Sequence, residues 1–98
     1  MMTNDNGIER RKHPRYRVQK NGKLVTADLV VFADVQVFEL SVGGARLMAQ
    51  TVITLPPRLG IQFEGDPILY PSRLRWQTDR IFGVKFVGEP VLIEPHRS

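Results

Sequence analysis

The chain has 98 residues, 42% of them hydrophobic and 24% charged, which is the composition of one small globular domain. It contains no Cys, and this excludes disulfides, thiolate metal sites and cysteine nucleophiles. The longest apolar run, 29–33, is far shorter than the ~20 residues that span a membrane, so no membrane insertion is expected. The first residues are polar and acidic, unlike a signal peptide, which makes the cytoplasm the expected location.

The formal net charge of +4 is concentrated in one segment, 9–17. This segment carries five Lys/Arg and one Glu, whereas the other residues balance nine Lys/Arg against nine Asp/Glu. Pro14 disfavours a helix here, because it restricts the residue before it and has no N–H to donate. We therefore predict a disordered tail over 1–8 and then a bent, flexible basic arm over 9–17. Such an arm is either a solvated tail or half of an anion-binding site.

Beyond the arm, short apolar segments alternate with turns rich in Gly and Pro, and no window sustains the 3.6-residue apolar repeat of a helix. A first strand is predicted over 24–29, after the turn-prone 20–22, and a second over 35–40. Four more strands are predicted over 45–49, 61–64, 73–77 and 82–86. Six short strands at roughly ten-residue spacing predict an all-β fold, a six-stranded antiparallel barrel over 18–88.

The strand pattern also assigns side chains to the core and to the surface. Three aromatic side chains fit core strand positions, namely Trp76, Phe82 and Phe86. Two arginines fit a solvated strand face, namely Arg73 and Arg75. In the C-terminal tail, 89–98, two prolines disfavour a long helix, and Leu92 and Ile93 are expected to pack back on the barrel.

A second polar motif ends the strand predicted over 35–40, where Glu39-Leu40-Ser41-Val42-Gly43-Gly44 combines a carboxylate, a hydroxyl and two glycines. The ionised Glu39 side chain only accepts hydrogen bonds, so it can take the N1–H and N2–H donors of a guanine edge. Ser41 can donate to a phosphate oxygen or cap the turn. The glycines let a ligand or a backbone come close. Taken alone, the motif also fits an ordinary serine–glycine β-turn.

Together the two segments resemble the PilZ family, whose members are cytoplasmic receptor domains for the bacterial second messenger cyclic di-GMP. The family's R-x-x-x-R motif reads Arg11-Lys12-His13-Pro14-Arg15 here, and its D/N-x-S-x-x-G motif reads Glu39-Leu40-Ser41-Val42-Gly43-Gly44. Further similarity is found in Ala45-Arg46-Leu47, the Leu-Pro loop at 55–56, the strand through Trp76 and Gly83-Val84-Lys85-Phe86. The resemblance covers about residues 9 to 87, and the order and spacing of the motifs make it strong.

The resemblance implies a single PilZ domain over 9–98 that binds cyclic di-GMP, has no catalytic activity and needs no cofactor. It implies these ligand-binding residues: Arg10, Arg11, Arg15, Glu39, Ser41, Gly43 and Gly44. Arginine forks bind phosphate and guanine O6/N7, which is the role implied for Arg11 and Arg15. Glu39 then holds a guanine edge and Ser41 supports the backbone. The family prefers Asp or Asn where Glu39 stands, and the extra methylene moves the carboxylate by about 1.5 Å.

Arg10 bears on the number of ligands. In the family, an arginine directly before R-x-x-x-R is associated with two intercalated cyclic di-GMP molecules, and other residues there with one. A stacked pair gathers four phosphate charges, and Arg10 adds a third cation to Arg11 and Arg15. Two ligand molecules per chain are therefore expected, with the signal passed to an unidentified downstream protein.

Two other functions compete with this interpretation. One is a ligand-independent interaction module on the same barrel, whose arm serves as an electrostatic docking tag. The other is a nucleic-acid binder resembling an OB-fold, although charge confined to one arm argues against a nucleic-acid face. An enzyme is not expected, because Ser41 has no His–Asp partners in sequence. No metal site is expected either, since the two histidines, His13 and His96, both lie beside prolines in exposed segments.

Overall fold

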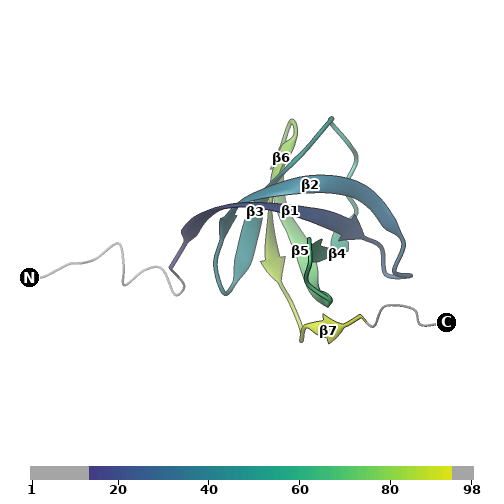
Figure 1. Ribbon diagram of the computed structural model, residues 1–98. Coiled ribbons are helices and arrows are strands. Elements are labelled where there is room, and N and C mark those ends of the chain that lie inside the picture. The colour runs from purple at the N-terminus through teal and green to yellow at the C-terminus, as the bar shows by residue number, and fades with distance from the viewer. Residues whose placement is uncertain (1–13, 94–98) are drawn as a thin grey trace, which may run out of the picture.

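The computed structural model describes residues 14–93, and this part of the chain contains seven strands and no helix (Figure 1). Along the chain the strands are β1 (Tyr16–Val25), β2 (Val31–Leu40), β3 (Gly44–Ala49), β4 (Arg58–Phe63), β5 (Ile68–Thr78), β6 (Ile81–Phe86) and β7 (Val91–Leu92). Short turns join most of them, and a longer segment over 50–57, which contains the paired prolines, leads from β3 to β4. The all-β class is therefore confirmed.

Six of the strands close into a barrel. Neighbours follow the order β4-β1-β2-β3-β6-β5, and a further pairing of β4 with β5 completes the ring. Every pair in the ring is antiparallel. The seventh strand, β7, pairs with Ile68 and Leu69 at the start of β5. The predicted six-stranded antiparallel barrel is confirmed, and its closure leaves few open strand edges.

The core lies inside the ring, and alternate residues of each strand supply it. In β3 the alternation is regular, because Ala45, Leu47 and Ala49 are buried while Arg46 is not. Several large side chains have no exposed surface, namely Leu24, Val37, Leu47, Ile61 and Phe82. Burial of these apolar groups is the main favourable term that holds the six strands together.

Near the N-terminus one turn prediction and one strand prediction are wrong. The residues predicted as a turn, 20–22, lie inside β1, where a register shift between Arg17 and Lys20 absorbs the irregularity. The predicted strand over 24–29 instead ends at Val25, and the chain reverses over 26–30. The amide of Leu29 donates to the carbonyl of Thr26 at 2.9 Å, and Leu29 takes a φ of 67°. Backbone hydrogen bonds thus override the apolar run, and Leu29 is left 56% exposed at this turn.

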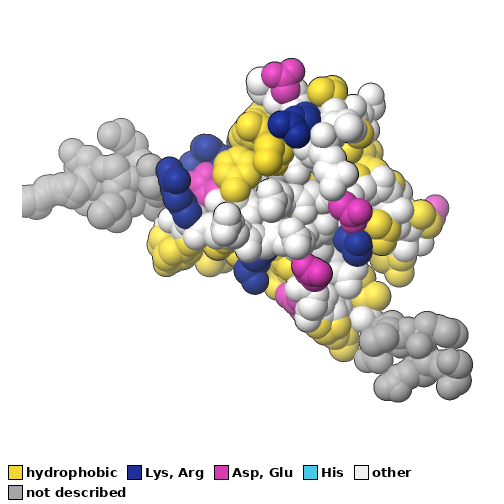
Figure 2. Space-filling view, turned by 45° about the horizontal axis from the view of Figure 1, so that its top comes forward, with side chains coloured by type: hydrophobic (Ala, Val, Ile, Leu, Met, Phe, Trp, Pro, Cys, Tyr) yellow, Lys and Arg dark blue, Asp and Glu magenta, His cyan; other side chains and the backbone are white. Residues whose placement is uncertain are grey.

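Figure 2 shows Lys/Arg and Asp/Glu side chains scattered over the described face and yellow side chains in several groups, one of them at the right-hand end, where Figure 1 places the β1–β2 turn. Tyr16 and Arg17 already belong to β1, opposite Leu40 and Glu39. The strand therefore begins inside the arm predicted over 9–17. The predicted tail over 1–8 and most of the arm lie outside the described residues.

Trp76 is not a core residue, contrary to the prediction, because its side chain is 41% exposed. The cause is a register shift in β5 between Leu74 and Trp76, which breaks the alternation of inward and outward side chains. On the neighbouring strand Phe82 is fully buried, as predicted, and Phe86 is half-buried. A bulge of this kind cannot be read from a strand pattern with a period of two.

The C-terminal tail returns to the barrel mainly through its backbone. Leu92 pairs with Ile68, and the amide of Ile93 donates to the carbonyl of Pro67 at 2.6 Å. The Leu92 side chain is nevertheless 57% exposed, so the predicted packing of this residue is wrong. A backbone ladder needs no side-chain burial, and β7 is only two residues long.

Two leucines of opposite burial test this description. We expect Leu47→Ala to lower the free energy of unfolding by about 2–5 kcal/mol, because it empties a fully buried site. The same change at Leu92 should cost less than about 0.5 kcal/mol, because that side chain is exposed. Urea denaturation followed by circular dichroism measures both. Equal losses for the two variants would contradict the closed core.

Candidate functional site

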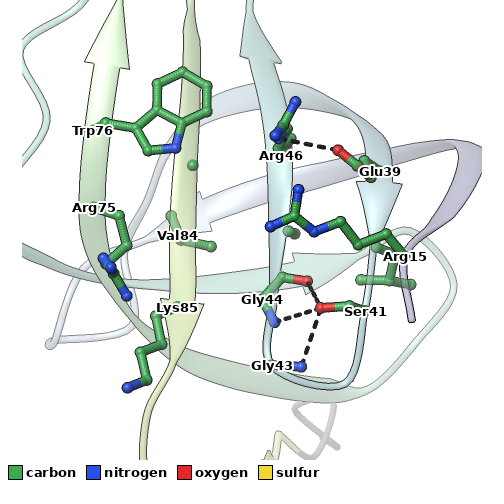
Figure 3. A pocket seen from close by; sticks show the side chains of 13 residues that line it. Arg15, Glu39, Ser41, Gly43, Gly44, Arg46, Arg75, Trp76, Val84 and Lys85 are labelled. Atoms are coloured by element: carbon green, nitrogen blue, oxygen red, sulfur yellow. Dashed lines mark hydrogen bonds and ion pairs between the residues drawn. The ribbon is translucent and has the colours of Figure 1, made fainter. Parts of the chain in front are cut away.

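A hollow of about 460 Å³ lies on the outside of the barrel, against the outer faces of β3, β5 and β6. The segment that leads into β1 and the turn between β2 and β3 form its other side. Figure 3 shows the lining side chains in two groups. Arg15, Glu39 and Arg46 stand on one side, and Arg75 and Lys85 stand on the other. The hollow therefore brings together residues that are up to seventy positions apart in the sequence.

The structure brings together five of the seven predicted site residues, Arg15, Glu39, Ser41, Gly43 and Gly44. The other two, Arg10 and Arg11, lie outside the described residues. The two predicted motifs thus meet in space, at least through Arg15 and the Glu39–Gly44 turn. Pairing of Tyr16 with Leu40 explains why, since it fixes the end of the arm beside the end of β2.

Ser41 holds the turn between β2 and β3. Its Oγ accepts hydrogen bonds from the amides of Gly43 and Gly44, each at 3.2 Å. The Ser41 amide donates to the carbonyl of Gly44 at 2.9 Å. The hydroxyl therefore caps the turn, which agrees with the backbone-supporting role that the family resemblance implies.

Gly44 is required by strand packing. A Cβ on this residue would lie 2.2 Å from the carbonyl oxygen of Val84, where no side chain fits. The backbones of β3 and β6 approach closely at this point, because Gly44 pairs with Lys85. Neither Gly43 nor Gly44 has a positive φ. Close approach, and not a left-handed backbone, is therefore the reason for glycine at position 44.

The carboxylate of Glu39 already has a partner in the hollow. Glu39 lies directly opposite Arg46 in the β2–β3 ladder, and its Oε1 is 3.0 Å from Arg46 Nε. Their side chains are 22% and 43% exposed, so water still reaches the pair. An exposed ion pair of this kind adds little stability, of order 0.5 kcal/mol. The pair can therefore rearrange at low cost when a ligand competes for either group.

Trp76 forms an apolar wall of the hollow, and Gly83 makes room for it. Gly83 of β6 pairs with both Arg46 and Trp76 on the two flanking strands. A Cβ on Gly83 would lie 2.4 Å from the indole Nε1, so the ring lies directly on the glycine. The Arg46 guanidinium is 5.8 Å from the ring centroid, within cation–π range. The bulge in β5 turns both Arg75 and Trp76 outward.

The hollow is cationic. It contains Arg15, Arg46, Arg75 and Lys85 against the single carboxylate of Glu39. Within residues 14–93, only Arg46 of these four cations forms an ion pair. The remainder of the chain outside the arm is neutral by count, but its charges are not evenly spread. Arg75 is exposed, as predicted, and it also lines this hollow.

Sequence reasoning did not identify four lining residues as site residues: Arg46, Arg75, Trp76 and Lys85. The register of three adjacent strands, β3, β6 and β5, brings these residues together. This register cannot be read from the linear sequence. One signal was present, namely a glycine inside a strand at position 83, a residue type that marks close approach. Among residues 14–93, no group of three or more His, Cys, Asp or Glu could hold a metal ion.

The contact between Trp76 and Gly83 provides a test. We expect Gly83→Ala to displace the indole from the sheet and to lower the free energy of unfolding by about 1–3 kcal/mol, because the new methyl group overlaps Nε1. The chain has one Trp, so its fluorescence reports the displacement directly. Ile81→Ala, on the same strand and 38% exposed, is the control. An unchanged emission spectrum in Gly83→Ala would exclude the contact.

No helix in the described part of the chain has the length and apolar character needed to cross a membrane. A search of curated proteins finds none that matches the chain. The family model of the PilZ domain matches residues 9–92, nearly the whole sequence. This family consists of cyclic di-GMP-binding domains, which are generally binding modules and not enzymes. The closed barrel, the Ser41 turn and this match together establish that the chain belongs to the PilZ domain family.

Proposed function

We propose that the protein is a cyclic di-GMP receptor that places its N-terminal arm over the hollow on binding and signals to a partner protein. It acts by binding alone. The observation that carries the proposal is the meeting of Arg15 with the Glu39–Gly44 turn in one cationic hollow, although the two segments are far apart in sequence. Family membership supplies the identity of the ligand.

The chemistry of the hollow suits this ligand. Cyclic di-GMP offers two phosphates and two guanines, and within 14–93 the cations Arg15, Arg75 and Lys85 have no carboxylate partner. Arginine forks bind phosphate in a bidentate manner and stack on bases. The exposed face of Trp76 offers a second stacking surface. Binding then combines charge neutralisation with stacking, which free inorganic phosphate cannot reproduce.

Glu39 has to exchange partners when the nucleotide binds. In the structure it pairs with Arg46, and the proposed role needs its oxygens for the N1–H and N2–H of guanine. Arg46 released from Glu39 stays over the indole, 5.8 Å from the ring centroid, where it can meet a phosphate or a base. The glutamate, one methylene longer than the family's Asp, is thus proposed to lower affinity through this competition without changing ligand identity.

The arm is proposed to close over the hollow from a fixed base. Tyr16 is paired with Leu40 in β1, while Arg15 precedes the strand and lines the hollow. The rest of the arm, including Arg10 and Arg11, is joined to the chain directly before this point. Residues that become ordered around a ligand in this way lose conformational entropy, and the new charge contacts offset this cost in free energy.

One observation favours a second candidate function, a ligand-independent interaction module. The Glu39–Arg46 pair occupies the carboxylate that the receptor role requires. In that case the hollow would be a docking surface for a protein, and the nucleotide would have no part. Titration with cyclic di-GMP, GTP and a short oligonucleotide separates this candidate, the receptor and a nucleic-acid binder.

The arginines of the first motif provide the direct test. We expect Arg11→Ala and Arg15→Ala each to weaken cyclic di-GMP binding by about 1–3 kcal/mol, ten- to a hundredfold, through loss of bidentate contacts. Arg58→Ala is the matched control, because Arg58 does not line the hollow. Isothermal titration calorimetry measures all three. If both motif variants bind within threefold of the parent protein, the site assignment is wrong.

The number of ligands is a separate prediction. We propose two cyclic di-GMP molecules per chain, because Arg10 and Arg11 join Arg15, Arg75 and Lys85 to set five cations against four phosphate charges. Arg10→Ala should reduce the stoichiometry to one, since it removes a charge and an outer stacking plane. Calorimetry at saturating nucleotide gives the number directly. One ligand per chain for the unmodified protein contradicts the proposal.

A further inference from the structure

The outer surface of the barrel is divided by charge. Four strands that are consecutive in the ring, β4, β5, β6 and β3, contain no Asp or Glu at all. The same strands carry five cations, Arg46, Arg58, Arg73, Arg75 and Lys85. The acidic strand residues, Asp34 and Glu39, both lie on β2. Arg46 is paired with Glu39, and the acids of the joining turns lie at the strand ends, so four cations on the outer faces of these strands have no ion pair within residues 14–93.

Three of these cations form a row across the strands. Arg58 lies directly opposite Arg73 in the β4–β5 ladder, and Arg73 lies directly opposite Lys85 in the β5–β6 ladder. All three are exposed, so they share the outer face. None of them belongs to an ion pair within residues 14–93. Like charges placed directly opposite each other destabilise a sheet, so this row has a cost that folding alone does not explain.

The row of Arg58, Arg73 and Lys85 extends beyond the hollow. Lys85 lines the hollow, but Arg58 and Arg73 do not. The bulge after Leu74 separates two arginines of β5, because it sends Arg75 into the hollow and leaves Arg73 in the row. The positive surface thus has one part that serves the hollow and another that continues round the barrel to β4.

We propose that the row Arg58–Arg73–Lys85 is the docking surface for an acidic helix of a partner protein. Adjacent strands lie about 4.8 Å apart, so the three cations span about 10 Å. On a helix, carboxylates at i, i+3 or i+4, and i+7 follow one face with 5–6 Å steps and span about 10.5 Å. The two spacings match, so one acidic helix face can meet all three cations. The proposal rests on the part of the proposed function in which the protein signals to a partner, and it specifies the chemistry of that partner. It does not depend on nucleotide binding.

Two other polyanions fit the row less well. Single-stranded nucleic acid needs aromatic stacking surfaces beside the cations, and the exposed aromatic on these strands, Trp76, belongs to the hollow. A membrane surface needs exposed apolar side chains that insert between lipids. The apolar neighbours of the row within its strands are buried, as Leu59 and Val84 are, or partly buried, as Leu74 and Phe86 are. An acidic protein segment requires neither feature.

The test uses the full chain and a fluorescent alanine-based helical peptide with glutamates at i, i+4 and i+7 on one face. A peptide of the same composition, with its glutamates spread around the helix, is the peptide control. We expect Arg58→Gln/Arg73→Gln to weaken binding of the one-face peptide about tenfold in fluorescence anisotropy. Lys20→Gln/Lys23→Gln removes the same charge from β1, outside the arm and the hollow, and should change binding less than twofold.

A second measurement guards against a folding artefact. Arg73→Gln should not lower the Tm, because it removes like-charge repulsion from an exposed position. Equal weakening by both double variants, or equal binding of both peptides, would overturn the proposal. So would tighter binding of duplex DNA or phosphatidylserine vesicles that depends on the same two arginines. Calorimetry with cyclic di-GMP on the same variants tests the receptor function separately. A negative result for peptide docking can then be distinguished from a negative result for nucleotide binding.

Discussion

The close approach of β3 and β6 is the constraint on which both the barrel and the site depend. These strands are not neighbours in sequence, and their pairing joins the first half of the ring to the second. Gly44 permits the approach on one strand, since any Cβ there would overlap the Val84 carbonyl. Gly83 leaves the space on the other strand that Trp76 fills. The same ladder therefore joins the two halves of the barrel and forms the floor of the hollow.

Charge in this protein is organised by strand register. Counting residues outside the arm gives a neutral body, yet the ladder positions gather cations on one side and leave the acids elsewhere. Arg75 and Lys85 line the hollow, and Arg58 and Arg73 continue the positive surface round the barrel. Within 14–93, Arg46 alone among the hollow's cations is neutralised, by the residue directly across the β2–β3 ladder. A field built in this way acts over several ångströms and attracts anions before contact.

Much of the fold could be predicted because its signals are local. Alternating apolar residues identified β3 and β6, and Gly and Pro identified most of the turns between strands. The prediction failed where tertiary pairing overrides local preference. Turn-forming residues at 20–22 remain in β1 because the strand has partners on both sides at Gly22. The bulge before Trp76 likewise arises from pairing with β6, so it has no local signal.

The site residues likewise divide into those with a local sequence signal and those placed by strand pairing. Ser41 and the glycines after it were predictable because they form a contiguous turn, and Arg15 because it belongs to a short motif. Arg75 and Lys85 face the hollow only through a register across two ladders, which no linear spacing encodes. The partner of Glu39 was missed for a related reason. The sequence places Arg46 within the similarity to the family, but its position across from Glu39 became clear only in the paired strands.

Closure of the ring also limits how the protein can respond to anything it binds. In a closed barrel each strand is hydrogen-bonded to two others, so sliding one strand breaks two ladders at once. Such a body cannot pass a signal along by deforming its sheet. A change must instead be expressed at the rim, where the chain enters β1 at Tyr16 and leaves through the two-residue β7. Binding on the outer surface can therefore leave the strand pairing of the barrel unchanged.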